Sequence, residues 1–528
     1  MKTYKAFFIC CLLLTTMSCR KELLNTVPKD RLASELFWKT QDDAIYAANG
    51  IYAVLGNQWR YASMDAFTDI GHFILQWRAE SEVEKHTFDA SNNVIASEWS
   101  YYYSIVRASN NFLENVDLIT EMDEALRSRL KAEARVLRAF SYINLVMLYG
   151  AVPLVTTGLD VEEAKSLTRT PEADIWDFVA SELTAAAADL PEVQQERGRV
   201  TSGTALGLKA RAMLYAGRHS EARSAARAVM DLGVHALHDS YKELFDYAGE
   251  SSSEIMFARQ QAKNIQPHAM FAFYTANSLF SQQCQVVPTK ALVDAYPMKS
   301  TGLPIGDPAS GFDRANPYVD RDPRLYHTVY LSGDRLPNGR ELNTLPGSGT
   351  GDDITISAEN VTPTGWYFKK YISEEDFADP WNCGVNLIYL RYAEVLLTYA
   401  EASIELGQID QSVLDALNGI RGRSDVDMPE ITTMDQSNLR EIVRRERMIE
   451  LALEGHRLFD IRRWEIGETA IRGSVKGMTY ESPGSPGNYV TVELSGYVKE
   501  FNPDKHYLWP IPFRELNLNR NLTQNPGF

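Results

Sequence analysis

The chain has 528 residues, a formal net charge of −17 at pH 7 and 45% hydrophobic residues. This composition is typical of a folded globular protein with enough apolar residues for one large core or several ordinary ones. The acidic balance excludes a nucleic-acid-binding role on electrostatic grounds, because there is no excess of basic residues to displace the counterions of phosphate groups.

The first eighteen residues are typical of an export signal. An apolar run, Ala6 to Leu14, follows two lysines and ends shortly before the dipeptide Ser18–Cys19. Because this run is much shorter than the ~20 residues that span a bilayer, we interpret residues 1–18 as a removable signal peptide and not as a membrane anchor. The segment is similar to bacterial lipoprotein signals, which implies that Cys19 becomes the acylated (palmitate-type) N-terminus of the mature chain. Ordinary secretion with a free Cys19 thiol is the alternative.

Two cysteines, Cys284 and Cys383, remain in the body of the mature chain. In an oxidising compartment they can form a disulfide, or each can lie buried as a thiol, and the sequence leaves both alternatives open. Two thiols alone cannot form a zinc site. The sequence therefore indicates no metal and no cofactor, although a structural metal ion stays open.

Helical periodicity dominates the first 250 residues. In the stretch 42–55, Ala44, Ala48 and Ile51 recur at spacings of three and four and therefore share one helix face. Similar patterns predict helices at 97–119, at 122–149 and from Pro171 to Leu190, the last with Thr170 as its N-cap.

An internal repeat follows. The segments 210–218 (ARAMLYAGR) and 400–408 (AEASIELGQ) both carry alanine at the first and third positions and glycine at the eighth, Gly217 or Gly407. Small residues allow two antiparallel helices to approach closely, and glycine suits the tight turn between them, as in a tetratricopeptide helix pair. Ordinary helical hairpins are the alternative. A further pair is expected at 439–453 and 455–465.

The composition changes between the two repeats. Residues 260–384 are rich in Gly, Pro, Asn, Asp and aromatics and show few helical periods. This segment is too long to be structureless in a compact domain, so we expect a packed excursion with short strands, for example at 364–372. The expected fold is mainly α, a helical scaffold with long irregular loops. We expect one domain over 19–528, with a helical part at 19–250, a loop-rich binding excursion at 251–386, and helical repeats with an extended tail at 387–528.

Six segments resemble, in the same order, blocks of the SusD/RagB family of nutrient-binding outer-membrane lipoproteins. The tail from Tyr507 to Phe528 (YLWPIPFRELNLNRNLTQNPGF) is close to the terminal signature of this family, and its prolines force an extended path. The other segments are 25–32 (NTVPKDRL), 135–155, 321–326 (RDPRLY), 390–423 and 444–464. One block alone would be weak, but the ordered set covers essentially the whole mature chain.

The resemblance implies a receptor that is not an enzyme. Members of this family lie on the outer face of the outer membrane, bind an oligosaccharide or, in some members, a peptide, and deliver it to a SusC-like TonB-dependent transporter. The present chain would then be a lipid-anchored surface protein for glycan uptake. A RagB-like peptide receptor, a glycan-processing enzyme and a structural helical-repeat adaptor are the alternatives. Arg20 and Lys21 follow Cys19 where surface-exposed members commonly carry acidic residues, so the membrane leaflet stays open.

Sugar rings are bound by flat aromatic faces, together with amide, carboxylate and guanidinium groups that meet the hydroxyls. Five tryptophans in helical or family segments are expected in the core: Trp38, Trp99, Trp176, Trp464 and Trp509. The candidate ligand-binding residues lie in or beside loops: Trp59, Tyr61, Trp77, Arg78, Tyr274, Asn277, Phe280, Trp366 and Trp381. Packing within the loops is the alternative for each aromatic among them, since large aromatic side chains are usually buried.

Other motifs have simpler interpretations. In the arginine-rich stretch 440–463, glutamates interleave at helical spacing, which predicts a salt-bridged helix and not an anion site. His235 and His238 lack the glutamate and the third ligand of a zinc site. A glycosidase needs only two facing carboxylates, which the glutamates of 80–84 could supply, so the lack of motifs does not close the enzyme alternative.

Overall fold

The computed structural model describes residues 37–56, 59–280 and 284–528, without the side chains of 59–62. The predicted signal peptide and Cys19 therefore lie outside the described residues. Over the described part the fold is mainly α with short two-stranded sheets, which confirms the predicted fold class. None of the helices in this part is long and apolar enough to cross a membrane.

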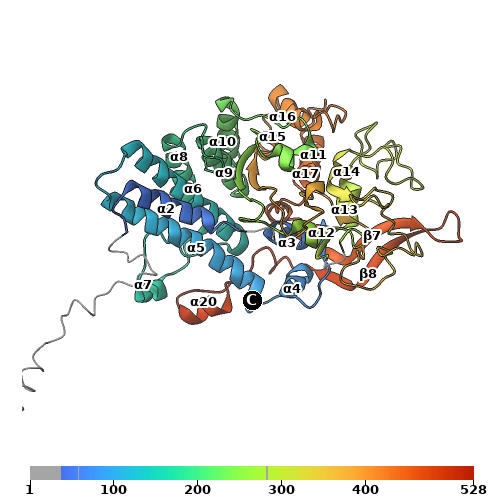
Figure 1. Ribbon diagram of the computed structural model, residues 1–528, viewed down its shortest axis with the longest axis horizontal. Helices are drawn as coiled ribbons and strands as arrows, with labels where there is room; N and C mark the ends of the chain where they lie inside the picture. The colour runs from blue at the N-terminus through green and yellow to red at the C-terminus, as the bar shows by residue number, and fades with distance from the viewer. Residues whose placement is uncertain (1–36, 57–58, 281–283) are drawn as a thin grey trace, which may run out of the picture.

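Long helices build one side of the molecule, and loops with short strands build the other (Figure 1). The helices of the first side are, in chain order, α2 (Gln41–Ala53), α5 (Asn93–Asn115), α6 (Glu124–Tyr149), α7 (Val161–Ser166), α8 (Glu172–Asp189), α9 (Ser202–Tyr215) and α10 (His219–Leu232). The pairs α5–α6, α6–α8, α8–α9 and α9–α10 pack against each other. Helices that follow one another in the chain are therefore mostly neighbours in space.

Local chemistry sets the ends of these helices. The Thr40 side chain accepts a hydrogen bond from the Asp43 backbone N–H, while the Asp43 carboxylate accepts from the Thr40 N–H, so α2 begins in a capping box. The prediction that Thr170 caps the helix of 171–190 is wrong. Pro171 is the residue before α8, and Thr170 pairs instead with Val152 in an isolated β-bridge.

The two repeat segments form helical hairpins. α9 packs against α10, and α15 (Tyr392–Glu405) packs against α16 (Gln411–Arg421). Gly217 and Gly407 have φ angles of +70° and +66° in the two turns, a region that residues with a Cβ atom avoid. Because α10 also packs against α15, the two hairpins join into one scaffold. The tetratricopeptide assignment itself stays a prediction.

The second side carries the loops and the short elements (Figure 1). These elements are α3 (Trp59–Ala66), β1 (Gly71–Phe73), α4 (Ala79–Lys85), α11 (Tyr241–Leu244), β2 (Ile255–Arg259), α12 (Met270–Tyr274), β3 (Val286–Pro288), α13 (Lys290–Ala295), α14 (Arg324–Thr328), β4 (Val329–Tyr330), β5 (Tyr367–Phe368) and β6 (Leu387–Arg391). The strands pair antiparallel as β1–β3, β2–β6 and β4–β5. The strand expected at 364–372 is only two residues long, because Gly365 and Tyr371 have positive φ angles on either side of it.

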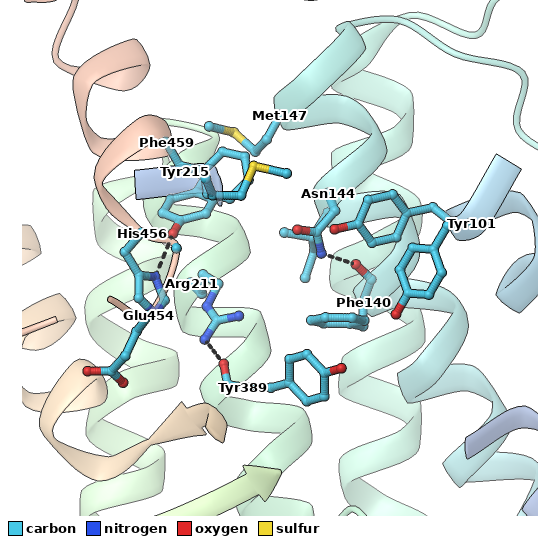
Figure 2. Close-up of a pocket in the computed structure, with 14 residues that line it drawn as sticks. Tyr101, Phe140, Asn144, Met147, Arg211, Tyr215, Tyr389, Glu454, His456 and Phe459 are labelled. Atoms are coloured by element: carbon cyan, nitrogen blue, oxygen red, sulfur yellow. Dashed lines mark hydrogen bonds between the residues drawn. The ribbon is translucent and has the colours of Figure 1, made fainter. Parts of the chain in front are cut away.

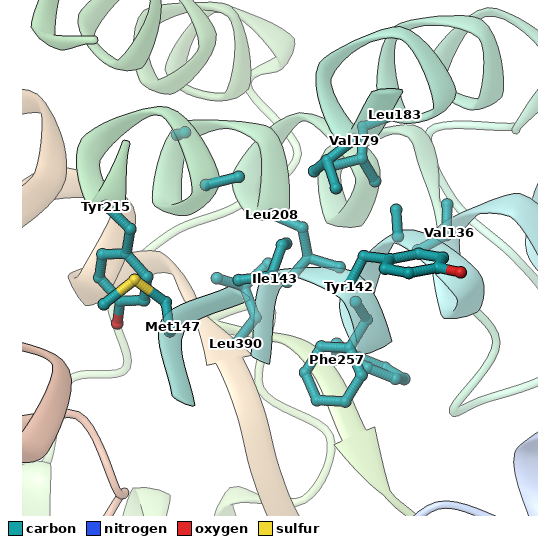
Figure 3. Packing of buried hydrophobic residues seen from close by; sticks show 14 of the residues in the cluster. Val136, Tyr142, Ile143, Met147, Val179, Leu183, Leu208, Tyr215, Phe257 and Leu390 are labelled. Atoms are coloured by element: carbon teal, nitrogen blue, oxygen red, sulfur yellow. The ribbon is translucent and has the colours of Figure 1, made fainter. Parts of the chain in front are cut away.

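The main core lies where the helices meet the strand pair β2–β6 (Figure 3). Tyr142 of α6 and Leu208 of α9 are fully buried there, in stretches where nearly every residue of each helix is buried. Phe257 of β2 and Leu390 of β6 belong to the same cluster. The strand pair therefore anchors the loop side to the helical scaffold.

The C-terminal part of the chain contributes elements to both the helical side and the loop side. Its elements are α17 (Gln436–Glu450), α18 (Arg457–Arg463), α19 (Gly467–Ala470), the projecting hairpin of β7 (Arg472–Glu481) and β8 (Tyr489–Glu500), and α20 (Phe513–Leu518). In the extended tail, the Trp509 backbone N–H donates to the Leu148 carbonyl of α6 at 2.7 Å, and the indole is buried. The expected core position of Trp509 is confirmed.

The arginine-rich stretch 440–463 is ion-paired, as predicted, but mainly with other elements and not along its own helix. Glu450 of α17 binds the guanidinium groups of Arg324, Arg391 and Arg423 at 2.8–3.0 Å. All four side chains are buried. Because charges in a protein interior require such pairing, this network joins α17 to β6 and to the loops around it.

Candidate functional site

Two of the predicted loop aromatics are strongly exposed. Trp77, in the turn before α4, is 66% exposed, and Trp381, in the turn before β6, is 46% exposed. Most large aromatic side chains are buried in a folded protein, so two exposed indoles on loops indicate apolar faces that are available to a ligand.

The Trp381 indole is held in place by two other rings. Phe273 of α12 meets it edge-on, with ring centroids 5.0 Å apart and an interplanar angle of 88°. Phe280 makes a second edge contact at 6.2 Å. The next residue, Asn382, exchanges two hydrogen bonds with Asn264, of 2.7 and 2.9 Å. The loop therefore presents Trp381 in a fixed orientation.

A chain of contacts leads from Trp77 toward Trp381. The Trp77 indole N–H donates to Glu359 at 2.8 Å, and the neighbouring Asn360 donates its amide N–H to the Asn277 side-chain oxygen at 2.6 Å. Three residues after Asn277, Phe280 contacts Trp381. We call this set the aromatic loop surface: Trp77, Phe273, Asn277, Phe280, Glu359, Asn360 and Trp381. Four predicted residues, Trp77, Asn277, Phe280 and Trp381, thus belong to one surface.

Two other predicted aromatics are corrected to core positions. Tyr274 is fully buried in a second hydrophobic cluster, where burial raises the pKa of its phenol. Trp366 is 2% exposed, and its indole N–H donates to the Tyr318 hydroxyl at 3.0 Å. Both rings are covered by surrounding side chains, so they support the loops and do not present a face to a ligand.

The remaining predicted residues have different positions. Arg78 is half-buried and pairs with Glu80 at 2.8 Å, so it supports the turn that carries Trp77. Trp59 begins α3. The side chains of Trp59 and Tyr61 lie outside the described residues, and their candidate role stays a prediction.

Sequence reasoning missed Phe273, Glu359 and Asn360. The aromatic run 271–274 (FAFY) could have indicated Phe273, since the neighbouring Tyr274 was already a candidate. No sequence pattern marks Glu359, which meets Trp77 across 282 residues of chain. Only the fold brings these two together.

The thiols near this surface are inert. Cys383 and Cys284 are both free and buried, so the alternative of two buried thiols is the one found in the structure. Burial raises the pKa of Cys383 to about 12, with a further contribution from nearby Asp376. Such a thiol stays neutral and is a poor nucleophile at physiological pH.

A small cavity lies between the helical scaffold and α18 (Figure 2). Its volume is about 70 Å³, and its wall combines aromatic rings with Asn144, Arg211 and His456. His456 points at the Tyr215 hydroxyl, 3.3 Å from its Nδ1, and burial lowers the histidine pKa to about 4. Because ligand pockets usually measure ~300–1,000 Å³ and one water occupies ~30 Å³, this cavity suits a few waters and not a sugar.

A much larger groove, about 1,100 Å³, runs along α5 beside α7 and α20. Its exposed apolar residues are aliphatic, among them Leu159, Val161 and Leu518. The two aromatic residues that line it are Trp99, which is buried, and Tyr103, which is only partly exposed. This groove therefore does not offer the exposed aromatic faces that sugar rings prefer. The aromatic loop surface is the stronger candidate site.

The glutamates of 80–84 each have a structural partner. Glu80 pairs with Arg78, Glu82 accepts from the Asn92 amide, and Glu84 is buried against His72 and Lys499. Within the part of the chain that the structure describes, no group of three or more His, Cys, Asp or Glu side chains is arranged to hold a metal ion.

Comparison with protein families gives two matches. Residues 247–528 match the model of the SusD family, and residues 42–214 match a model described as starch-binding and associating with the outer membrane. The first match alone spans more than half of the chain.

Named relatives and solved structures agree with these matches. SusD-like protein P2 of Formosa agariphila is 26% identical over 100% of both chains, and the starch-binding protein SusD of Bacteroides thetaiotaomicron is 24% identical over 82% of this chain and 78% of its own. A SusD-like carbohydrate-binding protein from Bacteroides fragilis is 30% identical, with a TM-score of 0.83 over 92% of this chain and 100% of its own. A laminarin-binding SusD-like protein, 20% identical, has the same fold, with a TM-score of 0.72 over 93% of this chain and 100% of its own. The chain therefore belongs to the SusD family.

Proposed function

We propose that this protein is a non-catalytic receptor that binds an oligosaccharide at the aromatic loop surface. The observation that carries the proposal is the exposed Trp381 indole, held edge-on by two other rings. An indole fixed in this way offers a flat apolar face to a sugar ring and loses little conformational freedom on binding. Glu359 and Asn277 lie on the same surface and can meet sugar hydroxyls.

The names of the relatives support a glycan ligand. The family model that matches 42–214 is described as starch-binding, and two similar proteins are named for binding starch and laminarin. Starch is an α-glucan and laminarin a β-glucan, so these two polymers are the first ligands to test.

The same proposal includes a location and a partner. Acyl chains on Cys19 would tether the protein to the outer membrane, facing the cell exterior, and the bound sugar would pass to a SusC-like TonB-dependent transporter. A tether at one end keeps the local concentration of receptor near the transporter high without requiring a tight interface.

Calorimetry on the purified full-length protein tests the binding site. We expect saturable binding to one class of oligosaccharide, and a loss of affinity of about tenfold or more in Trp381→Ala and Trp77→Ala. Tyr46→Ala is the matched control, because Tyr46 is 67% exposed on α2 and does not belong to the aromatic loop surface. Unchanged affinity in both tryptophan variants would overturn the site.

Two further results would favour the alternatives. Binding restricted to peptides would indicate a RagB-like receptor, and shortened products after incubation with labelled oligosaccharides would indicate an enzyme.

Cell experiments test the location. We expect Cys19→Ala to lose a fatty-acid label and to leave the membrane fraction, and external protease to digest the wild-type protein on intact cells. We also expect a SusC-like protein to co-purify with the wild type after mild detergent extraction. A wild-type chain that external protease leaves intact would place the protein inside the envelope.

A further inference from the structure

A second polar pocket lies where the end of α2, the loop between α8 and α9, and the end of β2 meet. Its volume is about 290 Å³, enough for one sugar unit. Arginine, amide and aromatic side chains line it together with one carboxylate: Asn49, Tyr52, Glu196, Arg197, Arg199, Arg259, Gln260 and Gln266. These are the side-chain types that bind sugars, but with an excess of guanidinium groups.

One arginine of this pocket is used by the fold. Arg199 donates to Glu133 at 2.9 Å and to Asn49 at 2.8 Å, and it also pairs with Glu196. Gly198, with a φ angle of +85°, lies so close to Gln260 that a Cβ atom would stand 2.5 Å from the Gln260 Cγ. The pocket wall is therefore built by specific contacts between the two loops.

The other two arginines have no acidic partner. The Gln261 side-chain amide donates its N–H to the Gln266 carbonyl, and its oxygen accepts from Nε of Arg259 at 3.2 Å. Among the described residues, neither the terminal nitrogens of Arg259 nor the guanidinium of Arg197 make a hydrogen bond or ion pair. Arg197 acts on Glu250 only at a distance, where it opposes the rise in the Glu250 pKa that burial causes. Two guanidinium groups without an acidic partner thus line one pocket of a chain with a net charge of −17.

This pocket adjoins the aromatic loop surface through one short loop. Gln266 lines the pocket, while Asn264, two residues earlier, holds Asn382 beside Trp381 through two hydrogen bonds. Ile265 stands between them and is 86% exposed. A ligand stacked on Trp381 can therefore extend over this loop toward Arg197 and Arg259.

We propose that Arg197 and Arg259 bind an anionic substituent, a carboxylate or a sulfate ester, on the oligosaccharide that stacks on Trp381. Guanidinium groups bind both kinds of oxyanion through paired, charge-assisted hydrogen bonds. The inference rests on the proposed function, because it names the chemical class of the same ligand: an acidic glycan.

Affinity electrophoresis of the full-length protein through gels with single polysaccharides provides the test. The panel pairs polygalacturonate with its methyl ester and a sulfated galactan with its desulfated form, and adds laminarin and starch. We expect the wild type to be retarded by one acidic polymer at least about tenfold more strongly than by its neutral counterpart. A stronger retardation by polygalacturonate than by its methyl ester identifies the substituent as a carboxylate. A stronger retardation by the sulfated galactan than by its desulfated form identifies it as a sulfate ester.

Variants separate this pocket from general charge effects. Arg197→Gln with Arg259→Gln is expected to lose the preference for the acidic polymer and to keep the affinity for the neutral one. Arg514→Gln with Arg520→Gln, which removes two exposed arginines in and just after α20, is the matched control and should keep the preference. Thermal unfolding of each variant verifies that it is folded.

The outcomes distinguish the two proposals. Wild-type binding confined to neutral polymers, or an acidic preference that survives the Arg197 and Arg259 substitutions, overturns the arginine pocket while the receptor function stands, provided that Trp381→Ala abolishes binding. Absence of binding to every polymer, with no effect of Trp381→Ala, overturns both.

Discussion

The Trp381 indole stands edge-on to the Phe273 ring, with 5.0 Å between centroids and 88° between planes. Phe273 belongs to α12 and Trp381 to a turn more than a hundred residues later, so a short helix orients a loop aromatic. Edge-to-face pairs of this kind stabilise by about 0.5–1.5 kcal/mol beyond their buried area. Phe273 is therefore a positioning residue for the proposed sugar platform.

Replacing Phe273 by leucine is expected to weaken glycan binding about three- to tenfold, because Trp381 gains freedom that the ligand must then restrict. Calorimetry on a double-mutant cycle with Trp381→Ala measures the coupling. In the Trp381→Ala background the Phe273 substitution should have no further effect. Equal losses in both backgrounds would show that Phe273 acts without Trp381.

The second prediction concerns the folding stability that Glu450 provides. Glu450→Gln leaves three buried arginines facing an uncharged amide, and removing one partner of a buried ion pair typically costs about 3–5 kcal/mol. We expect a large fall in the urea midpoint of unfolding. Glu162→Gln is the control, since Glu162 pairs with Lys165 at the surface, where such pairs contribute about 0–1 kcal/mol. Similar midpoints for the two variants would contradict the prediction.

The helical scaffold could be predicted from sequence because its signals are local. Ala210 and Ala212, followed by Gly217, place small residues and a turn within one segment, and the structure buries the first two and gives the third a positive φ angle. In α2, the spacings of four and three between Ala44, Ala48 and Ile51 predict the buried face of the helix, and all three residues are buried.

The exposure of the loop aromatics could not be predicted in the same way. Trp366 and Trp381 both lie in loop segments with a proline and a glycine nearby (PTGW and PWNCG), yet one is 2% and the other 46% exposed. The difference arises from distant segments: Tyr318 accepts from the Trp366 indole inside the core, whereas Phe273 supports Trp381 from one edge only. No local pattern contains such information.

The third prediction concerns the effect of buried His268 on folding stability at low pH. Its Nε2 donates to the Val385 carbonyl at 2.9 Å and its Nδ1 accepts from the Met270 N–H at 3.2 Å, so the neutral ring has both nitrogens satisfied. Burial lowers its pKa to about 4, below the ~6.5 of an unfolded histidine. Between these two pKa values only the unfolded chain binds the proton. The contribution of neutral His268 to the free energy of unfolding is therefore intact above about pH 6.5 and is lost as the pH falls toward 4.

The measurement is the difference in unfolding free energy between the wild type and His268→Gln, taken from urea titrations at several pH values. From pH 6.5 to 4 the wild type should lose up to about 1.4 kcal/mol per pH unit relative to the variant. Above pH 6.5 the difference should be constant. A difference independent of pH over the whole range would show that His268 is protonated as readily in the folded chain as in the unfolded one.

The fourth prediction concerns buried Asp65, whose contribution to folding stability is lost as the pH rises. It is fully buried in α3, where its Oδ2 accepts from the Leu453 N–H at 2.6 Å and its Oδ1 has no partner among the described residues. Burial raises the pKa of Asp65 to about 8, far above the 3.8 of a free carboxyl, so the folded chain keeps the proton that the unfolded chain releases. The stability from this retained proton is complete below about pH 3.8 and is lost as the pH rises through 8.

Asp65→Asn removes this titration and keeps an acceptor for the Leu453 N–H. The variant should therefore gain stability relative to the wild type by up to about 1.4 kcal/mol per pH unit between pH 5 and 8, and the gain should level off above pH 8. Urea midpoints at pH 5, 6, 7, 8 and 9 measure it. Asp65→Ala, which lacks the acceptor, should be less stable than Asp65→Asn at every pH, because it leaves the buried Leu453 N–H unpaired. If the difference in stability between Asp65→Asn and the wild type stays the same from pH 5 to 9, the Asp65 carboxyl is already ionised at pH 5. The attraction of Lys370 would then lower the Asp65 pKa more than burial raises it.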